Sequence, residues 1–202
     1  MRRGQPTRLG SVLLIIAIVA IVLSAVLWAT RTLFSNDSTD EPVELNAGQQ
    51  LLNEPTDQTA VRMSVRGPIV ASEQHYSIVI TISQSSRSIT TYRGYEGEII
   101  ETKTLPNTAA AFSDLLAALN RAGYMEENAS ITQDPEGICA VGQLIQFEVL
   151  DGDKSAKKLW TTSCAKLEGT FAGRDINVEA LFQNQIPESR AIIQRAKKIA
   201  DQ

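Results

Sequence analysis

The side chains best suited to covalent chemistry in this chain are two cysteines, Cys139 and Cys164, and a single histidine, His75. A thiolate beside an imidazole is a nucleophile for acyl transfer, and a guanidinium such as that of Arg174 can stabilise an oxyanion. Two cysteines can instead form one structural disulfide. One histidine and two sulfurs cannot complete a structural zinc site, so we expect no metal and no cofactor.

The segments around the cysteines favour the disulfide. Residues 143–149 alternate apolar and polar side chains, and the Asp-Gly pair at 151–152 is a strong turn signal before a second strand over 157–163. A turn centred on this pair places Cys139 opposite Cys164, and a longer loop shifts the register by a few residues but keeps the cysteines close. We therefore predict a Cys139–Cys164 bridge that stabilises the fold by roughly 3–4 kcal/mol.

The stretch over residues 9–30, LGSVLLIIAIVAIVLSAVLWAT, carries no charge and is mostly Leu, Ile, Val and Ala. As a helix it would span roughly 33 Å, enough for a hydrocarbon core of about 30 Å. It is longer than a secretory signal and has Leu27 and Trp28 where a cleavage site needs small residues. These features predict a retained signal-anchor helix in the lipid bilayer, with Trp28 at the interface.

The distribution of charge predicts the orientation of this anchor. Arg2, Arg3 and Arg8 precede the apolar stretch, whereas all 23 acidic residues and 15 of the 19 basic ones follow Arg31. Positive charge stays in the cytoplasm, so residues 1–8 should be cytoplasmic and the rest of the chain outside the cytoplasmic membrane, where disulfides persist. The acidic balance argues against nucleic acid as a partner.

Residues 31–60 are rich in Ser, Asp, Asn, Pro and Gln, a composition that predicts a flexible acidic stalk. The folded domain is then expected over residues 61–202. The stretches at 76–83, 88–95 and 98–105 predict an antiparallel meander of strands that precedes the cysteine hairpin.

A helix is predicted between Pro106 and Gly123, with one apolar stripe made by Phe112, Leu115, Leu116, Leu119 and Ala122. Further helices are expected near 175–184 and after Pro187. The fold class is α+β: an N-terminal transmembrane helix, then an antiparallel sheet of about five strands packed by one main helix, with C-terminal helices.

Three residues resemble the catalytic set of sortases, membrane-anchored transpeptidases that use a His, a Cys at a strand end and a following Arg. They are His75, Cys164 after the letters LWTTS, and Arg174. The resemblance implies a cysteine transpeptidase. Sortases carry Thr directly before the Cys, where this chain has Ser163, and Cys139 offers Cys164 a disulfide instead.

Two further resemblances concern the overall plan of the chain. A basic leader ending in Gly10, an apolar helix and a disulfide-bearing head resemble type IV pilin-like subunits, although SVLLIIAIV lacks the Glu usual in their helices. Within residues 62–187, the letters VRGPIVASEQHYSIVITIS, GICAVGQLIQFEV, LWTTSC, EGTFAG and LFQNQIP resemble signal-anchored extracytoplasmic proteins of candidate-phylum bacteria of the Saccharibacteria type. That resemblance implies no activity.

The sequence shows no convergent set of catalytic side chains, so we expect no enzyme but a non-catalytic binding or envelope-associated module. Its partner would be another protein or a polymer of the cell envelope. A sortase-like transpeptidase and a pilin-like subunit remain the alternatives. The sequence indicates neither the ligand nor the oligomeric state.

Overall fold

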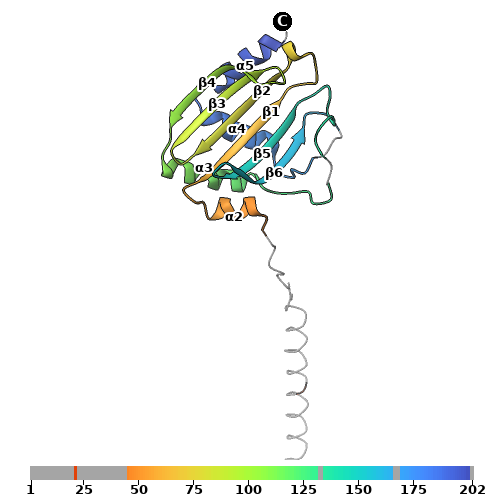
Figure 1. Cartoon of the computed structure of the whole chain (residues 1–202). Coiled ribbons are helices and arrows are strands. Elements are labelled where there is room, and N and C mark those ends of the chain that lie inside the picture. The colour runs from red at the N-terminus through yellow and green to blue at the C-terminus, as the bar shows by residue number, and fades with distance from the viewer. Residues whose placement is uncertain (1–20, 22–44, 132–133, 166–168, 201–202) are drawn as a thin grey trace, which may run out of the picture. The chain divides into compact units, whose positions relative to one another are not determined.

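Six strands form one antiparallel sheet in the order β4-β3-β2-β1-β5-β6. In the computed structural model, which describes Ile21 and residues 45–131, 134–165 and 169–200, the strands lie side by side in Figure 1. Their bounds are β1 Thr59–Arg66, β2 Tyr76–Ser83, β3 Ser86–Arg93, β4 Glu98–Pro106, β5 Leu144–Asp151 and β6 Lys154–Thr162.

Alternating side chains make one face of the central strands apolar. On β2, Ile78, Ile80 and Ile82 are buried while the residues between them are partly exposed. They lie opposite Val65, Met63 and Val61 of β1, and the same β1 residues lie opposite Ile145, Phe147 and Val149 of β5. This face therefore forms a continuous apolar surface that has to be covered.

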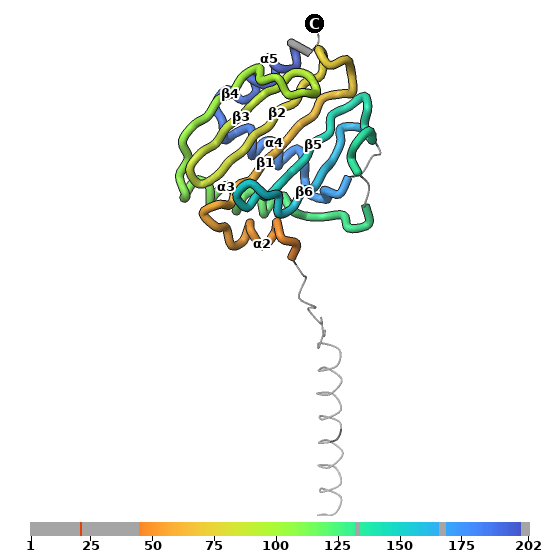
Figure 2. The backbone as a smooth tube through the Cα atoms, viewed as in Figure 1, coloured from red at the N-terminus to blue at the C-terminus, as the bar shows by residue number. Residues whose placement is uncertain are grey.

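Helices cover that face, as Figures 1 and 2 show behind the sheet. The described helices are α2 Ala47–Asn53, α3 Ala109–Arg121, α4 Asp175–Asn184 and α5 Ser189–Ala200, with a short 3₁₀ turn, η1, at Ser72–Gln74. Phe112, Leu115, Leu116 and Leu119 of α3 are buried, and Phe182 of α4 and Ile192 of α5 join the same core. The α+β class and the apolar stripe of α3 are confirmed.

The structure has six strands, against about five expected, and the main helix α3 shares the core with α2 and with the expected C-terminal helices α4 and α5. The folded unit also begins earlier, at Leu45. Helix α2 lies within the predicted stalk, where Leu52 is buried and the Asn46 side chain accepts a hydrogen bond from the Gln49 N–H at 2.9 Å. A flexible stalk is therefore wrong for residues 45–60, because α2 and β1 bury apolar side chains there.

The predicted anchor over 9–30, its charged flank of Arg2, Arg3 and Arg8, and Trp28 lie outside the described residues, apart from Ile21. Residues 31–44 of the predicted stalk lie outside them as well. Within the described part of the chain, every helix is too short or too polar to cross a bilayer.

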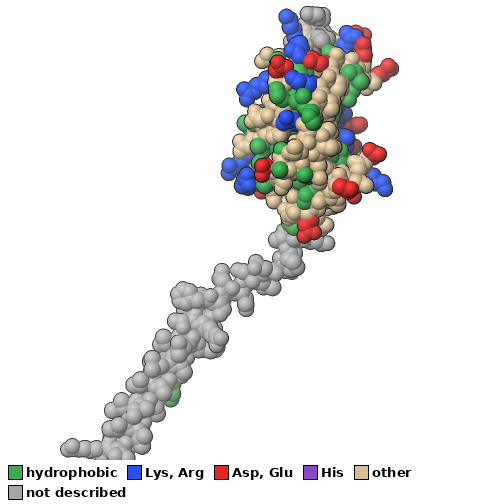
Figure 3. Space-filling view, turned by 90° about the vertical axis from the view of Figure 1, so that its left-hand side faces the viewer, with side chains coloured by type: hydrophobic (Ala, Val, Ile, Leu, Met, Phe, Trp, Pro, Cys, Tyr) green, Lys and Arg blue, Asp and Glu red, His purple; other side chains and the backbone are tan. Residues whose placement is uncertain are grey.

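The edge of the sheet at β4 carries charged side chains of both signs, and Figure 3 views the molecule from this side. Three ion pairs lie along it: Arg93–Glu98 at 2.7 Å, Lys103–Glu188 at 2.8 Å and Arg195–Glu101 at 2.8 Å. The last two tie β4 to the start and middle of α5. Such charges discourage the edge strand from pairing with another chain.

Candidate ligand-binding pocket

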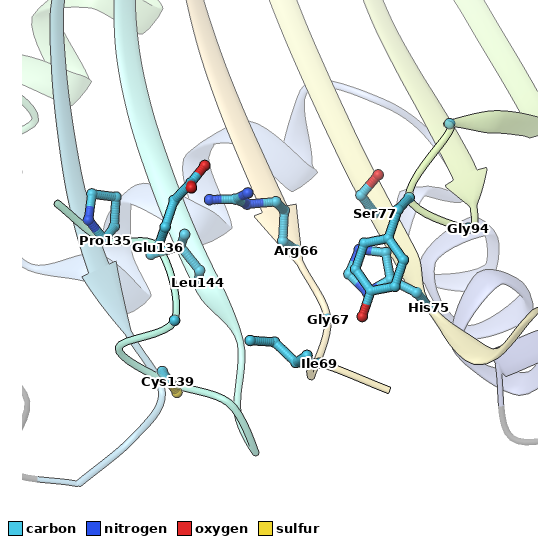
Figure 4. Close-up of a pocket in the computed structure, with 13 residues that line it drawn as sticks. Arg66, Gly67, Ile69, His75, Ser77, Gly94, Pro135, Glu136, Cys139 and Leu144 are labelled. Atoms are coloured by element: carbon cyan, nitrogen blue, oxygen red, sulfur yellow. The ribbon is translucent and has the colours of Figure 1, made fainter. Parts of the chain in front are cut away.

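A cavity of about 370 Å³ opens where β1 ends and β2 and β5 begin. It lies at one end of the sheet face opposite the helices, and its walls come from the strand ends and from the loops at 67–75, 94–97 and 134–139 (Figure 4). This volume is in the range of pockets that hold small molecules or single groups of a polymer. We call it the strand-end cavity.

Arg66 and Ser77 form the polar floor of the strand-end cavity. They are paired in register on β1 and β2, and the alternation that buries Val65 turns both side chains to the face away from the helices. The Nε atom of Arg66 is buried and has no hydrogen-bond partner among the described residues. Arg66 also belongs to none of the ion pairs in that part of the chain.

Glu136 stands across the cavity from Arg66, and Figure 4 shows the carboxylate and the guanidinium pointing toward each other. The backbone N–H of Glu136 donates to the Asp134 carboxylate at 3.0 Å, a local turn that orients this loop. The cavity therefore presents one cation and one anion that the fold itself does not join.

The remaining wall is apolar. Ile69, Pro135 and Leu144 line it together with the disulfide-bonded Cys139. A hydrogen bond from the Ile69 N–H to the Ala140 carbonyl, 2.8 Å, joins the loop after β1 to the loop before β5. The two loops thus form one continuous side of the cavity.

His75 and Tyr95 form the opposite side. Their rings stack with centroids 4.1 Å apart at an angle of 14°. His75 is buried, with Nδ1 at 3.1 Å from the Pro68 carbonyl, and the Tyr95 hydroxyl donates to the Val70 carbonyl at 2.8 Å. His75 therefore holds the loop after β1 in place, which is a structural role for the histidine of the sortase-like set.

The turn between β3 and β4 needs glycine at the edge of the cavity. Gly94 has φ +70° and Gly97 has φ +76°, values that residues with a side chain rarely adopt. A Cβ on Gly94 would also lie 3.0 Å from the Ser72 hydroxyl. Because neither position carries a side chain, the Tyr95 ring between them can fold back over His75.

The predicted disulfide between Cys139 and Cys164 is present, with a Cα–Cα distance of 5.9 Å. The hairpin register differs from the symmetric pairing about 151–152, because Asp151 lies opposite Lys154 and Leu144 opposite Thr162. Gly152, with φ +59°, takes the first position of the two-residue turn, which moves the turn one residue along. Cys139 lies in the loop before β5, which forms one side of the cavity, and it bonds to Cys164 from there.

The structure does not assemble the sortase-like set. Both cysteines of the chain lie in the disulfide, so no thiol is left as a nucleophile. His75 lines the cavity with Cys139, but Arg174 does not. Arg174 directly precedes α4, and its backbone N–H donates to the Ala122 carbonyl at 3.2 Å. Within the described residues, no group of three or more His, Cys, Asp or Glu side chains is placed to hold a metal.

Four exposed apolar side chains lie on or beside the loops that form the strand-end cavity. We call Ile69, Val70, Tyr95 and Val141 the apolar rim; their exposed fractions are 56%, 38%, 55% and 88%. The hydrogen bonds of Ile69 with Ala140 and of Tyr95 with Val70 keep these residues together. Exposed apolar groups gathered beside a cavity are typical of a contact surface.

Sequence reasoning missed Arg66, Ser77 and Glu136. Arg66 was visible as the last outward residue of an alternating strand directly before a Gly-Pro pair, and Ser77 as an outward residue of the next strand. The sequence could not show that Glu136, far along the chain, faces them.

Searches against protein-family models and against curated proteins found no match to this chain.

Proposed function

We propose that this chain is a membrane-anchored extracytoplasmic binding module, without catalytic activity of its own, that contacts another protein or an envelope polymer through the apolar rim and the strand-end cavity. The observation that carries the proposal is their place on the domain. They lie at the end of the sheet where β1 finishes, while Leu45, the first residue of the fold, and α2 lie at the other end (Figure 1). Within the folded unit, the rim thus lies at the end of the sheet away from its first residue.

The anchor in this proposal is the apolar segment over residues 9–30, oriented by Arg2, Arg3 and Arg8 with the folded unit outside. The disulfide supports this location, because such bridges persist in oxidising compartments and are rare in the cytosol. The resemblance to signal-anchored proteins of Saccharibacteria-type bacteria supports the same plan.

Membrane fractionation and protease treatment test the anchoring. The full chain should stay with membranes through alkaline carbonate washing, and protease added to intact cells should degrade residues 45–202. A variant lacking residues 1–30 serves as the control and should leave the membrane fraction. Recovery of the full chain as a soluble, protease-protected protein would contradict the proposed location.

Rim variants test the contact surface. The full chain in detergent micelles should bind envelope fractions from the producing cells, and Val141→Asp should reduce the bound fraction about tenfold or more, because a charge buried within an apolar contact costs several kcal/mol to desolvate. Ile176→Asp is the matched control, since Ile176 is 77% exposed on α4 and does not line the cavity. Equal binding by both variants would exclude the rim as the contact surface.

A further inference from the structure

The guanidinium of Arg66 lies at the floor of the strand-end cavity, and its Nε has no acceptor among the described residues. Its Nε is buried without a hydrogen-bond partner among the described residues, and no carboxylate of that part of the chain pairs with it. Buried donors are nearly always satisfied in native proteins. A planar guanidinium left open to a cavity is suited to a carboxylate, which it can bind through two parallel hydrogen bonds.

Glu136 restricts which carboxylate can enter. Its own carboxylate points toward Arg66 across the cavity, so a ligand that carries only negative charge meets repulsion on that side. A ligand with a nitrogen donor beside its carboxylate is attracted on that side instead, because the Glu136 carboxylate can accept a hydrogen bond from the ligand's N–H. The two side chains together thus suit a ligand that carries both a carboxylate and an N–H.

From these two charges and the apolar wall we propose that the strand-end cavity binds an α-amino-carboxylate group with an apolar side chain. This inference rests on the proposed function and names the group of the partner that the cavity receives. Arg66 holds the carboxylate, Glu136 accepts from the α-nitrogen, and the wall of Ile69, Pro135 and Leu144 contacts the side chain. The group belongs either to a free amino acid or to the C-terminal residue of a peptide.

The size and the walls of the cavity agree with such a group. About 370 Å³ is enough for one amino-acid residue with its side chain. Ser77 lies beside Arg66 in register and offers a hydroxyl to the same carboxylate. The Cys139–Cys164 bridge and the Ile69–Ala140 hydrogen bond fix the loops that form the wall, so the site is largely formed before the ligand arrives.

Titration with three small probes tests the proposal on the full chain in detergent micelles, with binding followed by ligand-observed NMR. The probes are leucine, N-acetyl-leucine and leucinamide. Leucinamide lacks the carboxylate and should bind at least about tenfold more weakly than leucine, the factor expected when a charge-assisted hydrogen bond is lost. Arg66→Gln should weaken the binding of leucine by a similar factor.

Arg87→Gln is the matched control, because Arg87 also has a buried Nε without a partner among the described residues but does not line the cavity. It should bind leucine as the unchanged chain does.

Glu136→Gln separates the two sources of the group. Binding of leucine alone, lost in this variant, assigns a free amino acid, because the ammonium needs the charge of Glu136. Comparable binding of N-acetyl-leucine, retained in the variant, assigns a peptide C-terminus.

Three results overturn the proposal: no probe binds, leucinamide binds as well as leucine, or Arg66→Gln binds leucine as tightly as Arg87→Gln. Each of these leaves the proposed function standing if Val141→Asp reduces binding to envelope fractions as expected. If the unchanged chain binds neither the probes nor the envelope fractions, both proposals fail. Circular dichroism of every variant separates a lost contact from a lost fold.

Discussion

At the scale of single residues, Tyr124 shows how the core accommodates a polar atom. Its ring is fully buried between Phe147 and Phe182, and its hydroxyl lies 2.9 Å from the Arg62 carbonyl and 2.7 Å from the Glu148 carbonyl, to which it donates. Burial raises the pKa of Tyr124 well above its ordinary value, so the hydroxyl stays protonated. Tyr124, three residues after the end of α3, is thus joined to the neighbouring strands β1 and β5.

Tyr124→Phe should lower the free energy of unfolding by about 1–2 kcal/mol, because two strand carbonyls lose a donor while the ring still fills its place. Urea denaturation of both proteins measures the difference. Tyr92→Phe, at a partly exposed position on β3, is the control and should change the midpoint little. An unchanged midpoint for Tyr124→Phe would mean that the hydroxyl contributes nothing net.

Glu179 on α4 predicts a pH dependence of stability. Burial raises the pKa of Glu179 above its ordinary value, the Asp175 carboxylate one turn earlier raises it further, and Lys197 of α5 opposes both. The folded state therefore binds the proton more tightly than the unfolded state, and this group makes the fold less stable as the pH rises through its titration.

Glu179→Gln should accordingly raise the melting temperature at pH 7 relative to the unchanged chain. The difference should disappear at a pH below the ordinary pKa of Glu, about 4.3, where the carboxyl is protonated in both states. Thermal melts over pH 3 to 8 measure it, with Asp114→Asn at an exposed position of α3 as the control. A difference that is largest at acid pH would contradict the sign argued here.

At the scale of elements, the loop before β5 depends on the disulfide. The loop reaches Cys164 at the end of β6, and Gly142 lies directly against the bridge, since a Cβ there would stand 2.6 Å from the Cys139 sulfur. Hydrogen bonds from the Ile69 N–H to the Ala140 carbonyl and from the Gln143 N–H to the Ser163 hydroxyl hold this loop beside the bridge. The disulfide therefore supports one wall of the strand-end cavity.

Replacing both cysteines by alanine should lower the free energy of unfolding by about 3–4 kcal/mol, the value for a bridge whose ends are 25 residues apart. Urea denaturation with and without a reductant measures it. The reductant should destabilise the unchanged chain by a similar amount and leave the double variant unaffected. A reductant effect on the double variant would show that the loss has another cause.

At the scale of the whole molecule, α2 decides where the domain begins. Leu52 is buried, and the Asn46 side chain donates to the Met125 carbonyl at 2.9 Å. Gly48 packs so closely that an added Cβ would stand 2.7 Å from both the Lys157 Cβ and the Met125 sulfur. The helix thus closes the end of the core where the chain enters.

A domain of residues 45–202 should accordingly be more stable than one of residues 55–202 by about 2 kcal/mol, the value of burying one leucine side chain. A fragment of residues 61–202 should lose more, because it also lacks Thr59 and Ala60 of β1. Thermal melts of the three fragments measure the order. Equal stability of the first two would show that α2 is dispensable to the fold.

Local patterns predicted many of the elements well. The alternation over 76–83 matches β2 from end to end, and the apolar stripe after Pro106 matches the buried face of α3. A residue's burial in these elements repeats with the period of the strand or helix, so the sequence alone shows which side is covered. Helix α2 escaped prediction because one and a half to two turns of helix carry too little periodic signal and depend on packing for stability.

The sequence by itself determined the α+β class, most of the strands and helices, and the pairing of Cys139 with Cys164, because each follows from residues near one another in the chain. It also supplied the prediction of an anchor over 9–30. Only the tertiary structure decided that β1 lies at the centre between β2 and β5, and that Arg66 and Glu136 face one cavity. The pairing of β1 with β5 and the approach of Glu136 to Arg66 join segments some 70 to 90 residues apart. They depend on which strands pair and how loops pack, which no local period encodes.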